Sequence, residues 1–241
     1  NKDGRGNNDG AIVAGARNGN NSLTMRRVTV TGSSRVRAFD LGRGVHYLHS
    51  CVASSTRVGY SMAHGNVTLF RCVAEDTSSN AIYATVSANI SVNAVSINNC
   101  LTHAILLEIS GTGSATSFQS PSAAFYSLTI TGAGASGAGT AHGIFVTEGS
   151  RAKVQGSRII SNYGAGVMIT SNSVVDLGGG VLGSSGGNTL RGNGITSGRD
   201  VVNSTTSSII VMAENNTWDH LTAADVSALD VTGLVDVVPL A

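Results

Sequence analysis

The amino-acid sequence predicts an all-β solenoid of about eight rungs, in which short strands and turns alternate along one chain. Two columns of apolar residues that advance together, and a glycine-rich composition with few charges, predict this fold. The first column is the fourth position of six similar segments, of which the first begins at Arg57: Tyr60, Tyr83, Leu106, Phe145, Met168 and Val202. A repeat of twenty to forty residues is typical of solenoids, in which like residues stack on like. We therefore expect these side chains to form one vertical file.

A second column follows the first along the chain. Its members are Val28, Cys51, Cys72, Cys100, Leu128, Ser157, Asn188 and Asn216. Two residues further on lie Val30, Ala53, Ala74, Thr102, Ile130, Ile159, Leu190 and Trp218, which are apolar in all but one case. A single rung cannot bury these residues, whereas rungs stacked about 4.8 Å apart share one core. The three cysteines would then form a buried ladder on adjacent rungs and behave as small apolar side chains.

Two glycine patterns, within residues 178–183 and 132–137, match the G-x-G-x-x-G fingerprint of dinucleotide-binding loops. That fingerprint requires a helix directly after the glycines and an acidic residue about 20 residues further on. The stretch "SSGGNTLRGNG" instead has further glycine breaks and no helical periodicity. We interpret both patterns as loops between rungs. Asn162 and Asn193, five residues past their column positions, are expected in turns with left-handed backbone.

Composition narrows the class of protein. Of the 241 residues, 41% are hydrophobic and 12% are charged, and the formal net charge is +1. This balance predicts no broad basic surface for nucleic acid. Apolar stretches are shorter than the roughly 18 residues that span a bilayer, so no membrane span is predicted. Three cysteines without a C-x-x-C motif predict neither a disulfide framework nor a zinc site, and we expect no metal ion or cofactor.

The chain is expected to have three parts: a polar N-terminal segment at residues 1–10, the solenoid at 11–220 and a C-terminal capping tail at 221–241. The tail is apolar enough to cover the last rung, and an uncovered solenoid end exposes unpaired strand edges. The first residues lack an initiator Met and an apolar stretch, so we expect no signal peptide among them. They are also too short and polar to serve as a cap, which predicts a partner or a further segment at that end.

The "GIFVT" and "GVMIT" strand openings, "NNTW" near the end, and "DLGGGVLGSSGGNTLRGN" followed by "DVVN" carry a family resemblance. They resemble right-handed parallel β-helix proteins of the pectate-lyase-like superfamily, and are similar to uncharacterised bacterial secreted or surface β-helix proteins. The resemblance covers roughly residues 10–220. It implies a single-stranded right-handed parallel β-helix and a secreted or cell-surface location.

Catalytic motifs of that superfamily are missing from this sequence. The paired aspartates, His-Gly and Arg-x-Lys elements of polygalacturonase-like enzymes have no counterpart, although "AHG" occurs at residues 63–65 and 141–143. The Asp-Pro-His-Glu motif of the epimerases and the calcium-binding acidic cluster of the pectate lyases are also not found. The resemblance therefore implies the fold more strongly than any activity.

The best candidate site combines two histidines and two carboxylates. His103 and His142 share a column on consecutive rungs, with Arg57 and Asn80 on one side, and Glu108 and Glu148 follow five and six residues later. Two imidazoles and two carboxylates can bind a ligand, hold a metal or exchange protons. The alternative is that all four are polar turn residues that face solvent. A long excursion, from residue 108 to 126, emerges beside them and is either part of a binding face or a tolerated insertion.

Three function classes follow from these observations. The leading hypothesis is a secreted or cell-surface scaffold or binding domain without catalysis, whose partner is a polysaccharide or an envelope component. The second is a polysaccharide lyase or glycoside hydrolase that acts on an acidic polysaccharide through the candidate residues, because such chemistry needs paired carboxylates or a base with a charge-stabilising group. The third is a self-assembling structural or adhesive solenoid.

Overall fold

The computed structural model describes residues 10–14, 21–32, 34–108, 121–134, 141–195, 198–205 and 208–241. Their regular structure is nearly all β-strand, in three sheets that we call A, B and C and whose strands all run parallel. Sheet A contains β1 (Gly10–Ala14), β4 (Arg37–Leu41), β7 (Val58–Ala63), β10 (Ile82–Thr85), β13 (Ile105–Glu108), β16 (Ile144–Val146), β19 (Val167–Thr170), β22 (Val201–Ser204) and β24 (Val231–Thr232).

Sheet B contains β2 (Leu23–Arg26), β5 (Gly44–His49), β8 (Gly65–Phe70), β11 (Asn89–Asn93), β14 (Ser122–Tyr126), β17 (Arg151–Gln155), β20 (Val174–Gly178), β23 (Val211–Ala213) and β25 (Val235–Asp236). Sheet C contains β3 (Thr29–Thr31), β6 (Val52–Ser54), β9 (Val73–Glu75), β12 (Ser96–Asn98), β15 (Thr129–Thr131), β18 (Arg158–Ile160) and β21 (Thr189–Arg191).

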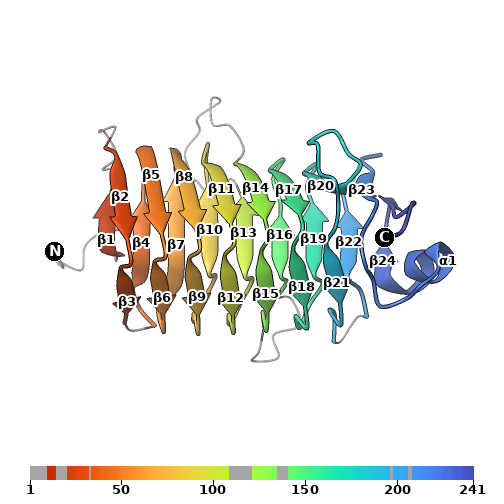
Figure 1. The fold of residues 1–241 in the computed structure, drawn as a ribbon, viewed down its shortest axis with the longest axis horizontal. Helices are drawn as coiled ribbons and strands as arrows, with labels where there is room; N and C mark the ends of the chain where they lie inside the picture. The colour runs from red at the N-terminus through yellow and green to blue at the C-terminus, as the bar shows by residue number, and fades with distance from the viewer. Residues whose placement is uncertain are drawn as a thin grey trace.

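The strands form a stack of rungs along one axis (Figure 1). Each rung takes one strand from each sheet in chain order, and its strands pair with those of the rungs before and after it. Strands β22 and β23 make an eighth rung, whose third side is marked by the parallel bridge between Thr189 and Thr217. The predicted single-stranded parallel β-helix of about eight rungs is confirmed.

The buried files inside sheet A correct one detail of the predicted register. Tyr60 pairs with Phe39 and Ile82, whereas Tyr83 pairs with Ser61, so Tyr60 does not belong to the file of Tyr83. Between equivalent inward positions, the step from Ala53 to Tyr60 is one residue shorter than the step from Ala74 to Ile82, which shifts the facing of every later residue in the strand. Tyr60 points into the core, where its ring stacks on Phe39 with centroids 5.0 Å apart.

The second column was also wrong in one rung. Ala74 pairs with Ile97, which in turn pairs with Ile130, so Ile97 holds the position predicted for Thr102. Consequently Cys100 lies three residues past the inward position and does not continue the ladder of Cys51 and Cys72. All three cysteines are buried and free, and burial raises the pKa of the Cys100 thiol to about 11.

Asn162 and Asn193 do not adopt left-handed backbone, contrary to prediction. They are buried one above the other, and the Asn162 Nδ2 amide donates to Asn193 Oδ1 at 2.8 Å. Asn188 and Asn216 form a second such ladder at 2.9 Å. Buried amides of this kind satisfy backbone groups on neighbouring rungs at the corners where the chain passes from one sheet to the next.

The corner from sheet B to sheet C is the most uniform one. In six successive rungs, from β2–β3 to β17–β18, two residues separate the strands. The first of the two always has positive φ, at Arg27, Ser50, Arg71, Ala94, Ser127 and Gly156. Its amide stays inside the hydrogen-bond ladder, since Ser50 N–H donates to Phe70 O and Arg71 N–H to Asn93 O. The corners on either side of sheet A vary in length from rung to rung.

The C-terminal residues lie at the end of the stack (Figure 1). The short helix α1 (Ala223–Asp225) and the π-helical turn η1 (Val226–Asp230) lead into β24 and β25, which extend sheets A and B. Val226, Val231 and Val237 are buried there, and Trp218 is 2% exposed. In the part of the chain that the structure describes, neither helical segment is long and apolar enough to cross a membrane. Most of the predicted polar N-terminal segment, at residues 1–9, lies outside the described residues.

Candidate functional site

His103 and His142 lie side by side on neighbouring rungs, as the sequence predicts. Each precedes its sheet A strand by two residues, and the strands pair through Ile105 and Ile144. Their imidazole rings are nearly parallel, with centroids 5.3 Å apart and planes at 11°. The Phe145 ring contacts both, at 4.9 and 5.7 Å. The stacked imidazoles and this phenyl ring form a continuous half-buried patch.

Both histidines are bound into the backbone ladder through Nδ1. The His142 backbone N–H donates to His103 Nδ1, and the Ala165 backbone N–H donates to His142 Nδ1, each at 3.0 Å. With Nδ1 accepting, the neutral ring carries its proton on Nε2. Burial is the main cause that lowers the pKa of both histidines to about 4, and at His103 the charge of the neighbouring His142 contributes to that value. Both rings are therefore neutral donors at neutral pH.

Register places Asn80 in the same file one rung before His103, as predicted. The position before it belongs to Val58, not Arg57, because Tyr60 rather than Gly59 lies opposite Ile82. Asn80 is buried, and its Oδ1 accepts a hydrogen bond from Thr102 Oγ1 at 2.7 Å. The one-residue shift that displaces Tyr60 also removes Arg57 from the candidate site.

Glu108 and Glu148 lie at the other end of the same strands. Glu108 follows His103 by five positions, which corresponds to about 16 Å of extended chain. The Tyr83 hydroxyl donates to Glu108 Oε1 at 2.7 Å, and Glu148 is exposed in a turn with positive φ. The structure thus brings together the histidines, and separately brings the two glutamates to one edge on adjacent rungs, but it does not join all four. The excursion at 109–120 lies outside the described residues.

The outer face of sheet A carries a row of apolar side chains. Five successive rungs place an apolar or aromatic residue at the same outward, half-buried position: Tyr83, Leu106, Phe145, Met168 and Val202. At the outward positions of sheet B the described side chains are mostly polar, as in Asn66, Asn89, Ser122 and Arg151. Among the described outward positions, sheet A therefore presents a longer apolar row than sheet B, and this row borders the stacked histidines.

The glycine-rich loop after β20 encloses a carboxylate of the chain itself. Asp176 is 1% exposed. Its Oδ1 accepts from the N–H groups of Gly178 and Gly180 (3.0 and 3.1 Å), and its Oδ2 from those of Leu182 and Ser184 (2.9 and 3.2 Å). A loop whose amides converge on one point forms an anion site, and here Asp176 fills it. This agrees with the interpretation of residues 178–183 as a loop between rungs rather than a nucleotide-binding motif.

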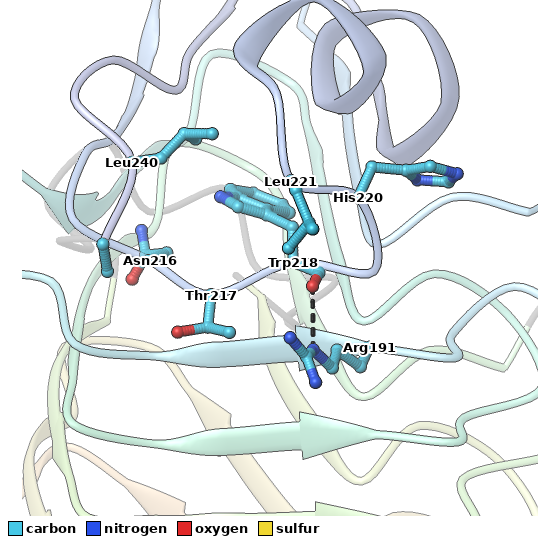
Figure 2. Close-up of a pocket in the computed structure, with 8 residues that line it drawn as sticks. Arg191, Asn216, Thr217, Trp218, His220, Leu221 and Leu240 are labelled. Atoms are coloured by element: carbon cyan, nitrogen blue, oxygen red, sulfur yellow. Dashed lines mark hydrogen bonds between the residues drawn. The ribbon is translucent and has the colours of Figure 1, made fainter.

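The last rung holds a small hollow and an acidic cluster that the sequence did not predict. The hollow, about 50 Å³, is lined by Arg191, Trp218, His220 and Leu240 among others (Figure 2). Beside it, carboxylate oxygens of Asp200, Asp219 and Asp230 lie within 4.8 Å of one another. These aspartates are far apart in the sequence and follow no motif, so only the folded chain brings them together.

Comparison with known proteins gives a family but no individual relative. No curated protein and no solved structure matches the chain. A family described as a protein of unknown function (DUF1565) matches residues 62–224. The match begins in β7 and ends in α1, so it includes the candidate histidines, the apolar row and the last complete rung. The stacked parallel sheets and this match together show that the chain is a parallel β-helix protein and belongs to the DUF1565 family.

Proposed function

We propose that this protein is a secreted or cell-surface binding scaffold that holds a polysaccharide, or another envelope component, along the outer face of sheet A without catalysis. The observation that carries the proposal is the apolar row on five successive rungs. Rungs repeat about every 4.8 Å, so the row offers regularly spaced contacts to an extended polymer. An apolar strip of this kind beside a few oriented polar groups is typical of ligand sites.

The chemistry of the strip suits sugar rings. A sugar ring has an apolar C–H face and a rim of hydroxyl groups, and the Phe145 and Tyr83 side chains offer the flat apolar surfaces on which such a face packs. The Nε2–H groups of His103 and His142 are neutral donors for hydroxyl oxygens. Because these imidazoles are uncharged at neutral pH, the strip selects for shape and hydrogen bonding more than for anionic charge.

The bonding of the candidate residues supports binding over turnover. A general base needs a free lone pair within reach of the proton it removes. The neutral imidazoles of His103 and His142 have one such lone pair each, at Nδ1, and backbone N–H groups occupy both. Glu108 accepts a hydrogen bond from the Tyr83 hydroxyl and lies at the other end of its strand from His103, so it forms no proton-transfer pair with that histidine. The histidine lone pairs that a base would use are therefore occupied by backbone N–H groups, whereas a proton-transfer pair needs one that is free.

Affinity measurements on a panel of neutral and acidic polysaccharides test the proposal. Phe145→Ala should weaken binding of a retained polymer at least about tenfold, since it removes the central aromatic contact. Tyr126→Ala is the matched control, because Tyr126 is a half-buried aromatic residue on the outer face of sheet B. Equal affinity in both variants, or no retention of any polymer by the folded protein, contradicts the proposal. Release of shortened or unsaturated products that Glu148→Gln abolishes would establish an enzyme instead.

A further inference from the structure

We propose that Asp200, Asp219 and Asp230 form a calcium site that fastens the C-terminal tail to the last rung of the β-helix. The site lies at the end of the stack and is independent of the binding strip proposed for sheet A. Its three carboxylates come from three different parts of the chain: the start of β22, the loop after Trp218, and the end of η1.

One oxygen in the cluster has no hydrogen-bond partner. Asp200 is 2% exposed, and its Oδ1 accepts from Asn193 Nδ2 at 2.7 Å. Its other oxygen, Oδ2, is buried and has no hydrogen-bond partner among the described residues. A buried carboxylate oxygen is normally hydrogen-bonded or bound to a metal, because leaving it bare loses its hydration without replacement. The bare oxygen is therefore an independent sign of a missing ligand.

Hydrogen bonds orient the other two carboxylates. Asp219 Oδ2 accepts from the Gly192 N–H at 2.7 Å, which leaves Oδ1 available. Asp230 Oδ1 receives a hydrogen bond from His220 Nδ1 at 2.7 Å, and its Oδ2 accepts from the His220 N–H at 3.3 Å. A hydrogen bond to a carboxylate leaves further lone pairs for a metal, and outer partners of this kind fix the orientation of the ligands.

The charge around the cluster favours a cation. Carboxylate oxygens of the three aspartates lie within 4.8 Å of one another, so their negative charges repel, and a bound cation would offset that repulsion. The nearby arginines face elsewhere: Arg199 donates to Ala228 O and Arg191 to Trp218 O. His220, which is half exposed, is a basic group that does reach the cluster: its Nδ1 lies 2.7 Å from Asp230 Oδ1.

The size of the cluster indicates the ion. Calcium binds oxygen ligands at about 2.3–2.6 Å, so two ligands of one ion can lie up to about 5 Å apart. The carboxylate oxygens of the cluster all lie within 4.8 Å of one another, so one calcium ion can reach all three aspartates. Magnesium binds at about 2.0–2.1 Å and usually keeps several waters with only one or two carboxylates, so three carboxylates suit calcium better. Asp219 is exposed, so water can complete the coordination, and we expect a dissociation constant of about 10⁻⁴–10⁻³ M.

The single tryptophan of the chain provides a local probe. Trp218 directly precedes Asp219, so terbium bound at the site should emit when the indole is excited, and calcium should suppress that emission by competition. Calcium should also raise the melting temperature of the chelator-treated protein by about 5 °C at saturating concentration. Magnesium at the same concentration should have a smaller effect.

Three variants assign the result to the cluster. Asp219→Ala removes an exposed ligand and should abolish both the terbium emission and the calcium-dependent rise in melting temperature. Asp200→Asn should weaken calcium binding at least about tenfold. Asp236→Asn, a tail carboxylate outside the cluster, should retain the full response. The proposal is overturned if the wild-type protein shows neither response, or if Asp219→Ala keeps both, in which case Asp200 simply holds a proton.

Discussion

Acidification should destabilise the protein through the stacked histidines. Both have a folded-state pKa of about 4, against an ordinary value of 6.5, so the unfolded chain binds protons more readily than the folded chain does. Their contribution to stability is complete above the ordinary pKa and is lost as the pH falls toward 4. Protonation would also break the bonds from the His142 and Ala165 backbone amides to the two Nδ1 atoms.

The size of the effect follows from the two pKa values. Between pH 7 and pH 5, a pKa that differs by 2.5 units between the folded and unfolded states changes the free energy of unfolding by about 2 kcal/mol for each histidine, and by about 4 kcal/mol for both. Urea unfolding followed by circular dichroism at a series of pH values measures this loss.

The double variant His103→Asn/His142→Asn isolates the histidine contribution. The chain already places Asn80 in the same file on the preceding rung, so an asparagine fits this position, and its Oδ1 can accept the backbone N–H that Nδ1 accepts. The variant should lose about 4 kcal/mol less than the wild-type protein between pH 7 and pH 5. Equal losses in the two proteins would show that the histidines are not held neutral by the fold, and the reasoning would fail.

Two further substitutions test buried polar groups. Asp176→Asn replaces an acceptor of four backbone N–H groups by an amide and should lower the free energy of unfolding by about 3–5 kcal/mol. The backbone amides of Leu182 and Ser184 should then exchange their hydrogens faster. Unchanged exchange at these two amides would contradict the role of Asp176 as the anion in this loop. Asn188→Ala should lower the free energy of unfolding by about 2–4 kcal/mol, because it leaves hydrogen-bonding groups on neighbouring rungs without a partner. Asn188→Ser should lower it less, because Ser157 already fills the same file one rung earlier. Equal losses for the two variants in urea unfolding would argue against the ladder.

Periodicity was sufficient to predict the β-helix because each rung repeats the same inward positions. It could not settle the register where turn length changes. The sequence places Tyr60 in the file of Tyr83, which faces outward in the structure, because an aromatic side chain satisfies the apolar pattern on either face of a strand. The sequence predicts Thr102 rather than Ile97 at the inward position, because Cys100 aligns with the cysteines of the two preceding rungs. Hydrophobicity shows that a column of apolar residues exists, but only the backbone pairing between strands shows which residue of each rung belongs to it.

The candidate site was predictable only in part. His103 and His142 share an equivalent position in similar segments, so the sequence could bring them together. Glu108 was predicted near the histidines because it follows His103 along one strand, but the extended chain between the two residues keeps their side chains apart. The aspartate cluster could not be found, because residues 200, 219 and 230 meet only after the tail folds back on the last rung. Asp176 did leave a signal: a lone carboxylate two residues before a run of glycines.

The uniform corner between sheets B and C limits how this molecule can diversify. Its two residues, one in left-handed backbone and the next turned inward, leave no space for an added residue without moving the strands on both sides. The corners that flank sheet A already differ in length, and they border the strip proposed to bind ligand. Grafted peptides and natural length variation should therefore be tolerated along those two edges, where new loops would surround the ligand. They should be rejected at the six two-residue corners of the third edge, whose seventh rung already carries a longer loop between β20 and β21.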